Sequence, residues 1–107
     1  MPNIYRVENN DGEGCYNGID SDLLASNASN GLSDHVSDKN HPTPYRDKGI
    51  KRDIKFNEIC GFKTLKQANK WFTKRQYEWL ESYGFYLKRI EVKQITAIGE
   101  YQVLAIR

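Results

Sequence analysis

Both ends of the chain carry short runs of β-branched and aromatic residues in which apolar and polar positions alternate imperfectly, a pattern typical of β-strands. Residues 4–8 (Ile-Tyr-Arg-Val-Glu) predict a first strand. Residues 85–92 and 100–106 predict two more strands, joined by a short connection over 95–99. We expect the two C-terminal strands to pair as a hairpin, which the first strand joins in a small antiparallel sheet.

A helical region is predicted between residues 65 and 83. Thr64 and Gln67 have the spacing of a capping box, in which each side chain binds the backbone N–H of the other residue. Thr73 and Gln76 repeat this spacing, and Gly84 is typical of the residue that ends a helix. The pattern predicts two abutting helices or one kinked helix. Its apolar residues recur at helical spacing: Leu65, Ala68, Trp71, Phe72, Tyr77, Leu80 and Tyr83.

The middle of the chain is polar and predicts little regular structure. Residues 20–25 suit a short helix, and residues 50–55 suit either a strand or a helical turn. Between them, residues 26–48 form a long polar loop in which two prolines forbid helix. Loops of this length are often functional, so we expect a binding surface here. The prediction is a single α+β domain over residues 1–107, a small antiparallel sheet packed on one or two helices with this irregular region.

Composition limits the function classes. The 107 residues are 38% hydrophobic and 12% aromatic, which is typical of a globular domain with an aromatic-rich core. The net charge of +2 gives no strong positive field, so nucleic-acid binding is the weakest of the hypotheses. The chain has no apolar run that would span a membrane and begins without the features of a signal peptide. We therefore expect a cytoplasmic protein.

Residues that commonly carry chemistry are sparse. The nucleotide-binding and hydrolase motifs are absent, and Cys15 and Cys60 form no CxxC pair. His35 and His41 are too few to predict a metal site. Free thiols in a reducing compartment are the expected state of the cysteines, with a disulfide or a metal site as the alternatives. A nucleophilic cysteine–histidine pair is a further alternative from residue type alone.

Basic residues gather in two places, around residues 48–55 and along the predicted helix. The lysines of the helix recur at intervals of three and four, which places them in one stripe. Such a stripe is either a solvated face or an electrostatic footprint for phosphates or an acidic protein. The candidate partner-binding residues are His41, Tyr45, Lys63, Lys66, Lys70 and Lys74.

The whole chain resembles a group of small bacteriophage and prophage proteins. The resemblance lies in these short motifs: Ile4-Tyr5-Arg6-Val7-Glu8, Gly12-Glu13-Gly14-Cys15-Tyr16, His41-Pro42-Thr43-Pro44, Gly61-Phe62-Lys63-Thr64-Leu65-Lys66-Gln67, Trp71-Phe72, Tyr83-Gly84-Phe85 and Gly99-Glu100-Tyr101-Gln102-Val103. It implies an accessory protein that binds and inhibits a host protein without catalysis and without a cofactor. Anti-CRISPR and other counter-defence proteins are of this kind, and a host defence protein is then the expected partner.

A more distant likeness is to the ADP-ribosyltransferase fold. Arg6 on the first strand, the segment Phe62-Lys63-Thr64 before a helix, and Gln102 on the last strand stand in the order of that family's motif residues. The resemblance implies NAD as cofactor, and an enzyme or a degenerate relative. Gln102 is neutral where most active members carry glutamate, and Glu100 lies two residues earlier on the same face.

The same resemblance implies roles for individual residues. Arg6 would hold a phosphate of NAD, Thr64 would shape the pocket, and Gln102 or Glu100 would act on the ribose. Tyr16 or Trp71 would stack on the nicotinamide. These roles compete with ordinary structural ones, in which Arg6 pairs with a nearby glutamate (Glu8 or Glu100), Thr64 caps a helix and Gln102 is a plain strand residue.

Overall fold

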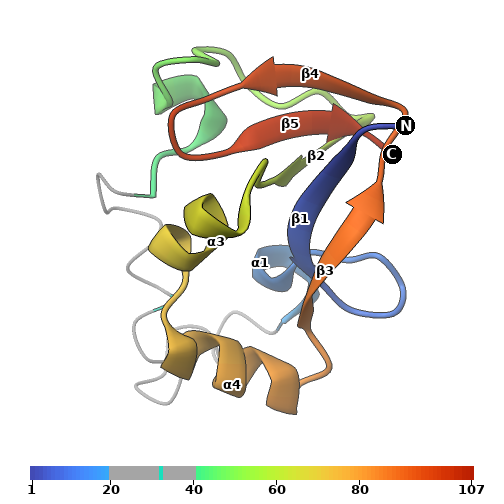
Figure 1. Ribbon diagram of the computed structural model, residues 1–107, viewed down its shortest axis with the longest axis vertical. Coiled ribbons are helices and arrows are strands. Elements are labelled where there is room, and N and C mark those ends of the chain that lie inside the picture. The colour runs from blue at the N-terminus through green and yellow to red at the C-terminus, as the bar shows by residue number, and fades with distance from the viewer. Residues whose placement is uncertain (20–31, 33–40) are drawn as a thin grey trace.

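The computed structural model describes residues 1–19, 32 and 41–107, and these form the predicted α+β class of fold (Figure 1). The strands are β1 (Asn3–Glu8), β2 (Glu58–Gly61), β3 (Tyr86–Glu91), β4 (Gln94–Ile98) and β5 (Val103–Ile106). The helices are α1 (Cys15–Gly18), α3 (Leu65–Trp71), α4 (Lys74–Ser82) and a 3-10 turn, η3 (Pro44–Arg46). The helix predicted over 20–25 and most of the loop predicted over 26–48 lie outside the described residues.

The described strands form two antiparallel sheets, β1-β3 and β2-β5-β4. The prediction of one sheet with a hairpin between residues 85–92 and 100–106 is therefore wrong. The connection predicted over 95–99 is largely strand β4, which makes the hairpin with β5, while β3 pairs with β1. The chain turns directly after β3, and there the N–H of Lys93 donates to the carbonyl of Ile106 at 2.8 Å.

Among the described residues, an isolated β-bridge joins the two sheets where β1 passes the end of β2. Tyr5 and Phe62 exchange both backbone hydrogen bonds at 2.7 Å. Gly61 lies beside this bridge, and a Cβ atom there would come within 2.8 Å of the Tyr5 carbonyl oxygen. A glycine is required because only its backbone can approach the neighbouring strand so closely. The sheets thus diverge from one point, as Figure 1 shows.

The two abutting helices are confirmed as α3 and α4. Thr73 and Gln76 form the complete predicted capping box. At α3 the box is only half formed, because Thr64 accepts from the N–H of Gln67 while the Gln67 side chain binds the N–H of Lys63 instead. Gly84 follows α4 with φ +84°, the left-handed conformation expected of a terminating glycine. Because α3 ends before α4 begins, the predicted lysine stripe is divided between two helices.

The prediction of a strand or helical turn over residues 50–55 is wrong. The segment is irregular, and Lys51 has φ 52°. Two buried carboxylates bind its backbone and neighbours: Asp47 anchors its start, and Glu58 accepts from the N–H of Lys55 at 2.9 Å. These side chains supply the hydrogen bonds that a strand would obtain from a ladder.

The core has two parts. An aliphatic cluster of Ile4, Val92, Val103 and Ala105 lies between the sheets. The other cluster is rich in aromatic residues, as predicted, and includes Phe62, Trp71, Phe72 and Phe85. In the part of the chain that the structure describes, no helix has the length and apolar character needed to cross a membrane.

Candidate ligand pocket

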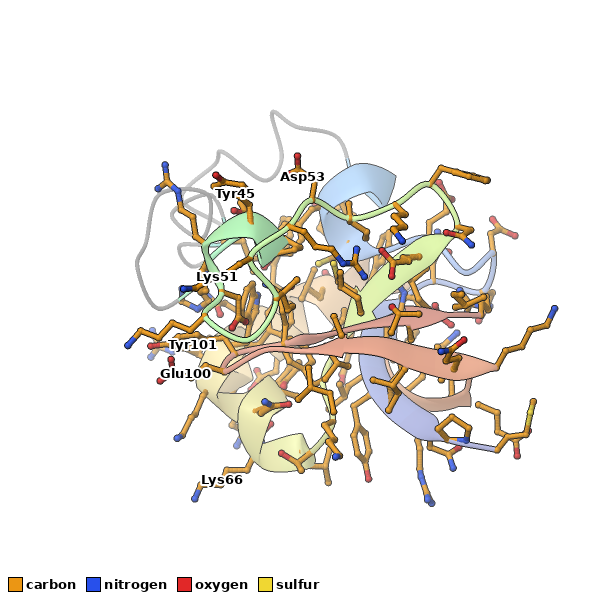
Figure 2. The ribbon with its side chains drawn as sticks, turned by 90° about the horizontal axis from the view of Figure 1, so that it is seen from above. Tyr45, Lys51, Asp53, Lys66, Glu100 and Tyr101 are labelled. Atoms are coloured by element: carbon orange, nitrogen blue, oxygen red, sulfur yellow. The ribbon has the colours of Figure 1, made fainter. Side chains whose placement is uncertain are left out.

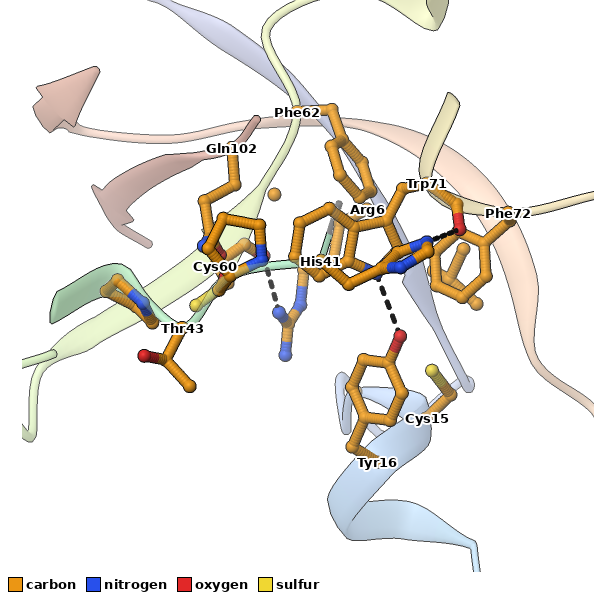
Figure 3. A pocket seen from close by; sticks show the side chains of 15 residues that line it. Arg6, Cys15, Tyr16, His41, Thr43, Cys60, Phe62, Trp71, Phe72 and Gln102 are labelled. Atoms are coloured by element: carbon orange, nitrogen blue, oxygen red, sulfur yellow. Dashed lines mark hydrogen bonds between the residues drawn. The ribbon is translucent and has the colours of Figure 1, made fainter. Parts of the chain in front are cut away.

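A cavity of about 270 Å³ opens where the two sheets diverge (Figure 3). Five separate segments contribute to it: β1, α1, residues 41–44, the end of β2 with Phe62, and the end of α3. Gln102, just before β5, completes the lining. The volume is near the lower end of the range for small-molecule sites, roughly 300–1,000 Å³, so the cavity suits one ring system with its nearest substituent.

Aromatic rings form most of its wall. The Trp71 ring lies 5.6 Å from Phe62 and meets the His41 ring edge-on at 5.0 Å between centroids. Tyr16 stacks on Phe72 at 6.3 Å, and its hydroxyl accepts a hydrogen bond from the Trp71 indole N–H at 2.8 Å. The Tyr16 ring is partly exposed, yet burial of the hydroxyl raises its pKa well above the usual value. These contacts keep the aromatic wall in place.

Arg6 provides the positive charge. Its Nε donates to Glu8 at 3.1 Å and its Nη1 donates to the Cys60 carbonyl at 2.6 Å, which confirms the predicted pairing with Glu8. Nη2 has no hydrogen-bond partner among the described residues. It lies against Gly14, where a Cβ atom would be 2.9 Å away. The guanidinium is therefore fixed by two of its nitrogens, and the third is available to an acceptor in the cavity.

The segment 41–44 closes one side of the cavity and is held at both ends. His41 Nε2 donates to the Trp71 carbonyl at 2.7 Å, since a carbonyl oxygen can only accept. The Gln102 side-chain amide donates to the Pro42 carbonyl at 2.6 Å. Asp47, which is fully buried, accepts the consecutive backbone N–H groups of residues 100, 101 and 102. Gln102 thus positions the pocket wall through its neutral amide.

The two cysteines are free and line the cavity. Burial raises the pKa of Cys15 to about 12 and also raises the pKa of Cys60, although the charge of Arg6 opposes both shifts. Both groups are therefore thiols near neutral pH and poor nucleophiles. Among the described residues, no three or more His, Cys, Asp or Glu side chains gather as a metal site would require.

The structure brings together four of the residues predicted to bind or act on NAD: Arg6, Tyr16, Trp71 and Gln102 all line the cavity. Thr64 does not line it, and its hydroxyl caps α3, as the structural alternative predicted. Glu100 is exposed and also lies outside the lining. Thr64 and Glu100, which the ADP-ribosyltransferase likeness would place at the ligand, thus lie outside the cavity.

The residues predicted to bind a partner are dispersed. His41 belongs to the pocket wall, whereas Tyr45 is exposed on η3. The lysines at 63, 66, 70 and 74 are exposed along the two helices. Phe62 was expected only as part of a motif, and Pro42 and the two cysteines were not expected to join it in one site, because these residues meet through long-range packing.

The fold and the cavity define a small α+β protein with a ligand-sized pocket between two diverging sheets. Over residues 1–107 the chain matches the family described as the bacteriophage T4 Y00F protein, and it belongs to that family. It is therefore a phage protein of the accessory kind, as the first resemblance implied. No curated protein and no solved structure matches the chain.

Proposed function

We propose that the protein binds a ligand with a flat ring and an adjacent anionic or hydrogen-bond-accepting group, for which the nicotinamide end of NAD is the candidate. One observation carries this proposal: Arg6, Tyr16, Trp71 and Gln102 come from four separate segments and line one cavity. The aromatic wall suits a flat ring. The Nη2 of Arg6, held by contacts at its other nitrogens, suits a phosphate or carbonyl oxygen.

The proposed activity is binding without turnover. Cleavage of the bond between nicotinamide and ribose builds positive charge on the sugar, which a carboxylate stabilises. Among the described residues that line the cavity there is no Asp or Glu. Gln102 stands where most active ADP-ribosyltransferases carry a glutamate. Its amide donates to the Pro42 carbonyl and brings no charge. A glutamate there would place a carboxylate oxygen against the Pro42 carbonyl oxygen.

An amide NMR titration tests this proposal, with NAD, nicotinamide mononucleotide and AMP as probes. We expect the mononucleotide and NAD to shift the amides of Arg6, Tyr16 and Phe62 along the same paths, because the nicotinamide end enters the cavity. AMP should leave these amides unchanged. Absence of shifts with both nicotinamide probes at millimolar concentration would overturn the proposal. Shifts with AMP alone would assign the cavity to adenine instead.

Gly14→Ala should weaken mononucleotide binding about tenfold. The new Cβ would lie 2.9 Å from Nη2 of Arg6, so the guanidinium must move away from its present position. A tenfold loss corresponds to about one charge-assisted hydrogen bond. The backbone of Gly14, with φ −71° and ψ 156°, accepts alanine without strain. Dissociation constants from the same NMR titration measure the effect.

A second variant and a control accompany it. Arg6→Lys retains the positive charge, but its ammonium group lacks the planar fork with which a guanidinium can bind Glu8, Cys60 and a ligand at once. Ligand binding should therefore fall in this variant also. Arg89→Lys, an exposed position on β3, is the matched control and should bind as wild type does. Equal affinities in all four proteins would show that Arg6 does not contact the ligand.

We also propose, as a second function, that the protein inhibits a host defence protein in the cytoplasm of the infected bacterium, as anti-CRISPR proteins do. The observation that favours it is the exposure of Tyr45, Ile54 and Phe56 outside the pocket. Phage plating on bacterial strains that carry defined defence systems tests it. Expression of the protein should restore plating on at least one strain. Unchanged plating on all of them would count against inhibition.

A further inference from the structure

Residues 45–56 present large apolar side chains to solvent. Phe56 is fully exposed, Tyr45 is 62% exposed and Ile54 is 42% exposed. Large apolar side chains in such positions are costly to hydrate and are common anchors of protein interfaces. The pocket uses none of these three residues. The segment is therefore a surface distinct from the ligand site.

The same segment is strongly basic at its surface. Residues 45–56 are all described, and their exposed cations are Arg46, Lys48, Lys51 and Lys55. Arg52 is neutralised by Glu58, to which its two terminal nitrogens donate at 2.8 Å. Asp47 is buried, which leaves Asp53 as the exposed carboxylate of the segment. Apolar anchors within a cationic rim complement an acidic surface that has apolar sockets.

The backbone of this surface is held in place before any partner arrives. The N–H groups of Ile50 and Lys51 donate to the Asp47 carbonyl at 2.9 and 3.0 Å. At the other end, Glu58 binds Arg52 and the N–H of Lys55. Preorganisation of this kind lowers the entropy that binding costs. Figure 2 shows Tyr45 and Asp53 at the top of the molecule and Lys66 of α3 at the bottom, so the two basic surfaces are separate.

We propose that residues 45–56 dock onto an acidic protein surface containing apolar sockets. This inference deepens the proposed inhibition of a host protein and is independent of the pocket. A protein is favoured over nucleic acid for two reasons. Ile54 has no aromatic face on which a base can stack, and the net charge of +2 is low for a nucleic-acid binder. Single-stranded nucleic acid is kept as an outcome of the test.

Fluorescence anisotropy with designed probes tests the proposal. The main probe is an amphipathic helical peptide with one face of glutamates and one of leucines. Two matched peptides replace either the leucines with serine or the glutamates with glutamine, and an oligothymidine represents nucleic acid. We expect the main peptide to bind about tenfold or more tightly than either matched peptide, with an affinity that falls as salt rises. The oligothymidine should bind more weakly than the main peptide.

Two variants locate the surface, each with its control. Phe56→Ala and the pair Lys51→Glu with Lys55→Glu should each weaken peptide binding about tenfold or more. Leu65→Ala removes an exposed apolar side chain of α3, and Lys66→Glu with Lys70→Glu repeats the charge change there. These controls should bind the peptide as wild type does. All variants should keep wild-type affinity for nicotinamide mononucleotide.

Three results would overturn the assignment. They are absence of peptide binding, tighter binding of oligothymidine, and equal losses in the α3 variants. The first two exclude an acidic protein partner for this surface, and the third moves the interface to the helices. None of them bears on inhibition itself, because that proposal fails separately when the wild-type protein leaves phage plating unchanged.

Discussion

Replacing Asp47 with asparagine should lower the free energy of unfolding by about 3 kcal/mol. The side chain has no exposed surface, and its two oxygens accept the N–H groups of Glu100, Tyr101 and Gln102 at 2.5, 3.0 and 3.2 Å. Asparagine keeps one acceptor oxygen but turns an NH₂ group toward a backbone donor. At least one buried N–H then lacks a partner, and the remaining bonds lose their charge.

Thermal unfolding followed by circular dichroism measures this effect. For a domain of this size, a loss of 3 kcal/mol lowers the Tm by about 12 °C. Asp53→Asn is the matched control, because Asp53 carries the same side chain on an exposed part of the neighbouring loop. Its Tm should change by less than about 2 °C. Equal Tm shifts in the two variants would mean that the buried Asp47 carboxylate stabilises the fold no more than the exposed Asp53 carboxylate does.

The same substitution should reach the pocket. Asp47 holds the N–H of Gln102, and the Gln102 side chain holds the carbonyl of Pro42 in the pocket wall. Gly99 lies so close to the Asp47 carboxylate that a Cβ atom there would be 2.3 Å from it. Any shift of the Asp47 side chain therefore moves residues 99–102 together. This couples stability at a buried carboxylate to the geometry of a ligand site.

Much of the fold could be predicted from local sequence because its signals are local. The T-x-x-Q spacings at Thr64 and Thr73 act within one helical turn, and both helices begin where they predict. The short strand β1 was also recognisable from its β-branched and aromatic residues. Strand pairing was predicted incorrectly because the partner of a strand depends on contacts distant in sequence. Nothing local indicates that β3 pairs with β1 and not with β5.

The pocket also contains residues that the sequence could indicate and residues whose positions depend on long-range contacts. Arg6, Tyr16, Trp71 and Gln102 could be proposed from residue type and order, and they do line one cavity. Residues 26–48 were expected to carry a binding surface, but the place of the wall at 41–44 in this pocket could not be predicted, because it depends on Asp47. An aspartate in a polar segment rich in Asn, Asp and Ser is typical of a solvated turn. Its burial results from three backbone N–H groups more than 50 residues away, which no local pattern reveals.

Strand β2 illustrates a further limit. It begins with Glu58, and a charged residue at that place is a poor indication of a buried strand. Arg52 and Thr96 make its burial possible, since the guanidinium donates twice to the carboxylate and the Thr96 hydroxyl donates once. Thr96 belongs to β4, where the sequence predicts a connection over residues 95–99. The sequence predicts no strand at β2 and a connection at β4, and the polar contact between Glu58 and Thr96 joins these two segments across 38 residues.

Glu58→Gln should lower the free energy of unfolding by about 2 kcal/mol at neutral pH and should have little effect near pH 2. Hydrogen bonds from Arg52, and secondarily from Thr96 and the N–H of Lys55, lower the pKa of Glu58 from 4.5 to about 2, although burial opposes the shift. The folded protein then binds this proton less readily than the unfolded chain does. Ionised Glu58 consequently stabilises the fold fully above about pH 5, and this contribution disappears as pH falls to about 2.

Urea unfolding at several pH values between 2 and 7 separates this effect from general acid sensitivity. Wild type should lose stability more steeply between pH 5 and pH 2 than Glu58→Gln, because glutamine cannot be protonated in this range. Glu91→Gln, an exposed position on β3, should retain the wild-type slope. Parallel profiles for wild type and Glu58→Gln would contradict a lowered pKa at Glu58. They would also show that the Glu58 carboxylate does not stabilise residues 52–58. This segment includes Phe56 and forms one end of the proposed docking surface.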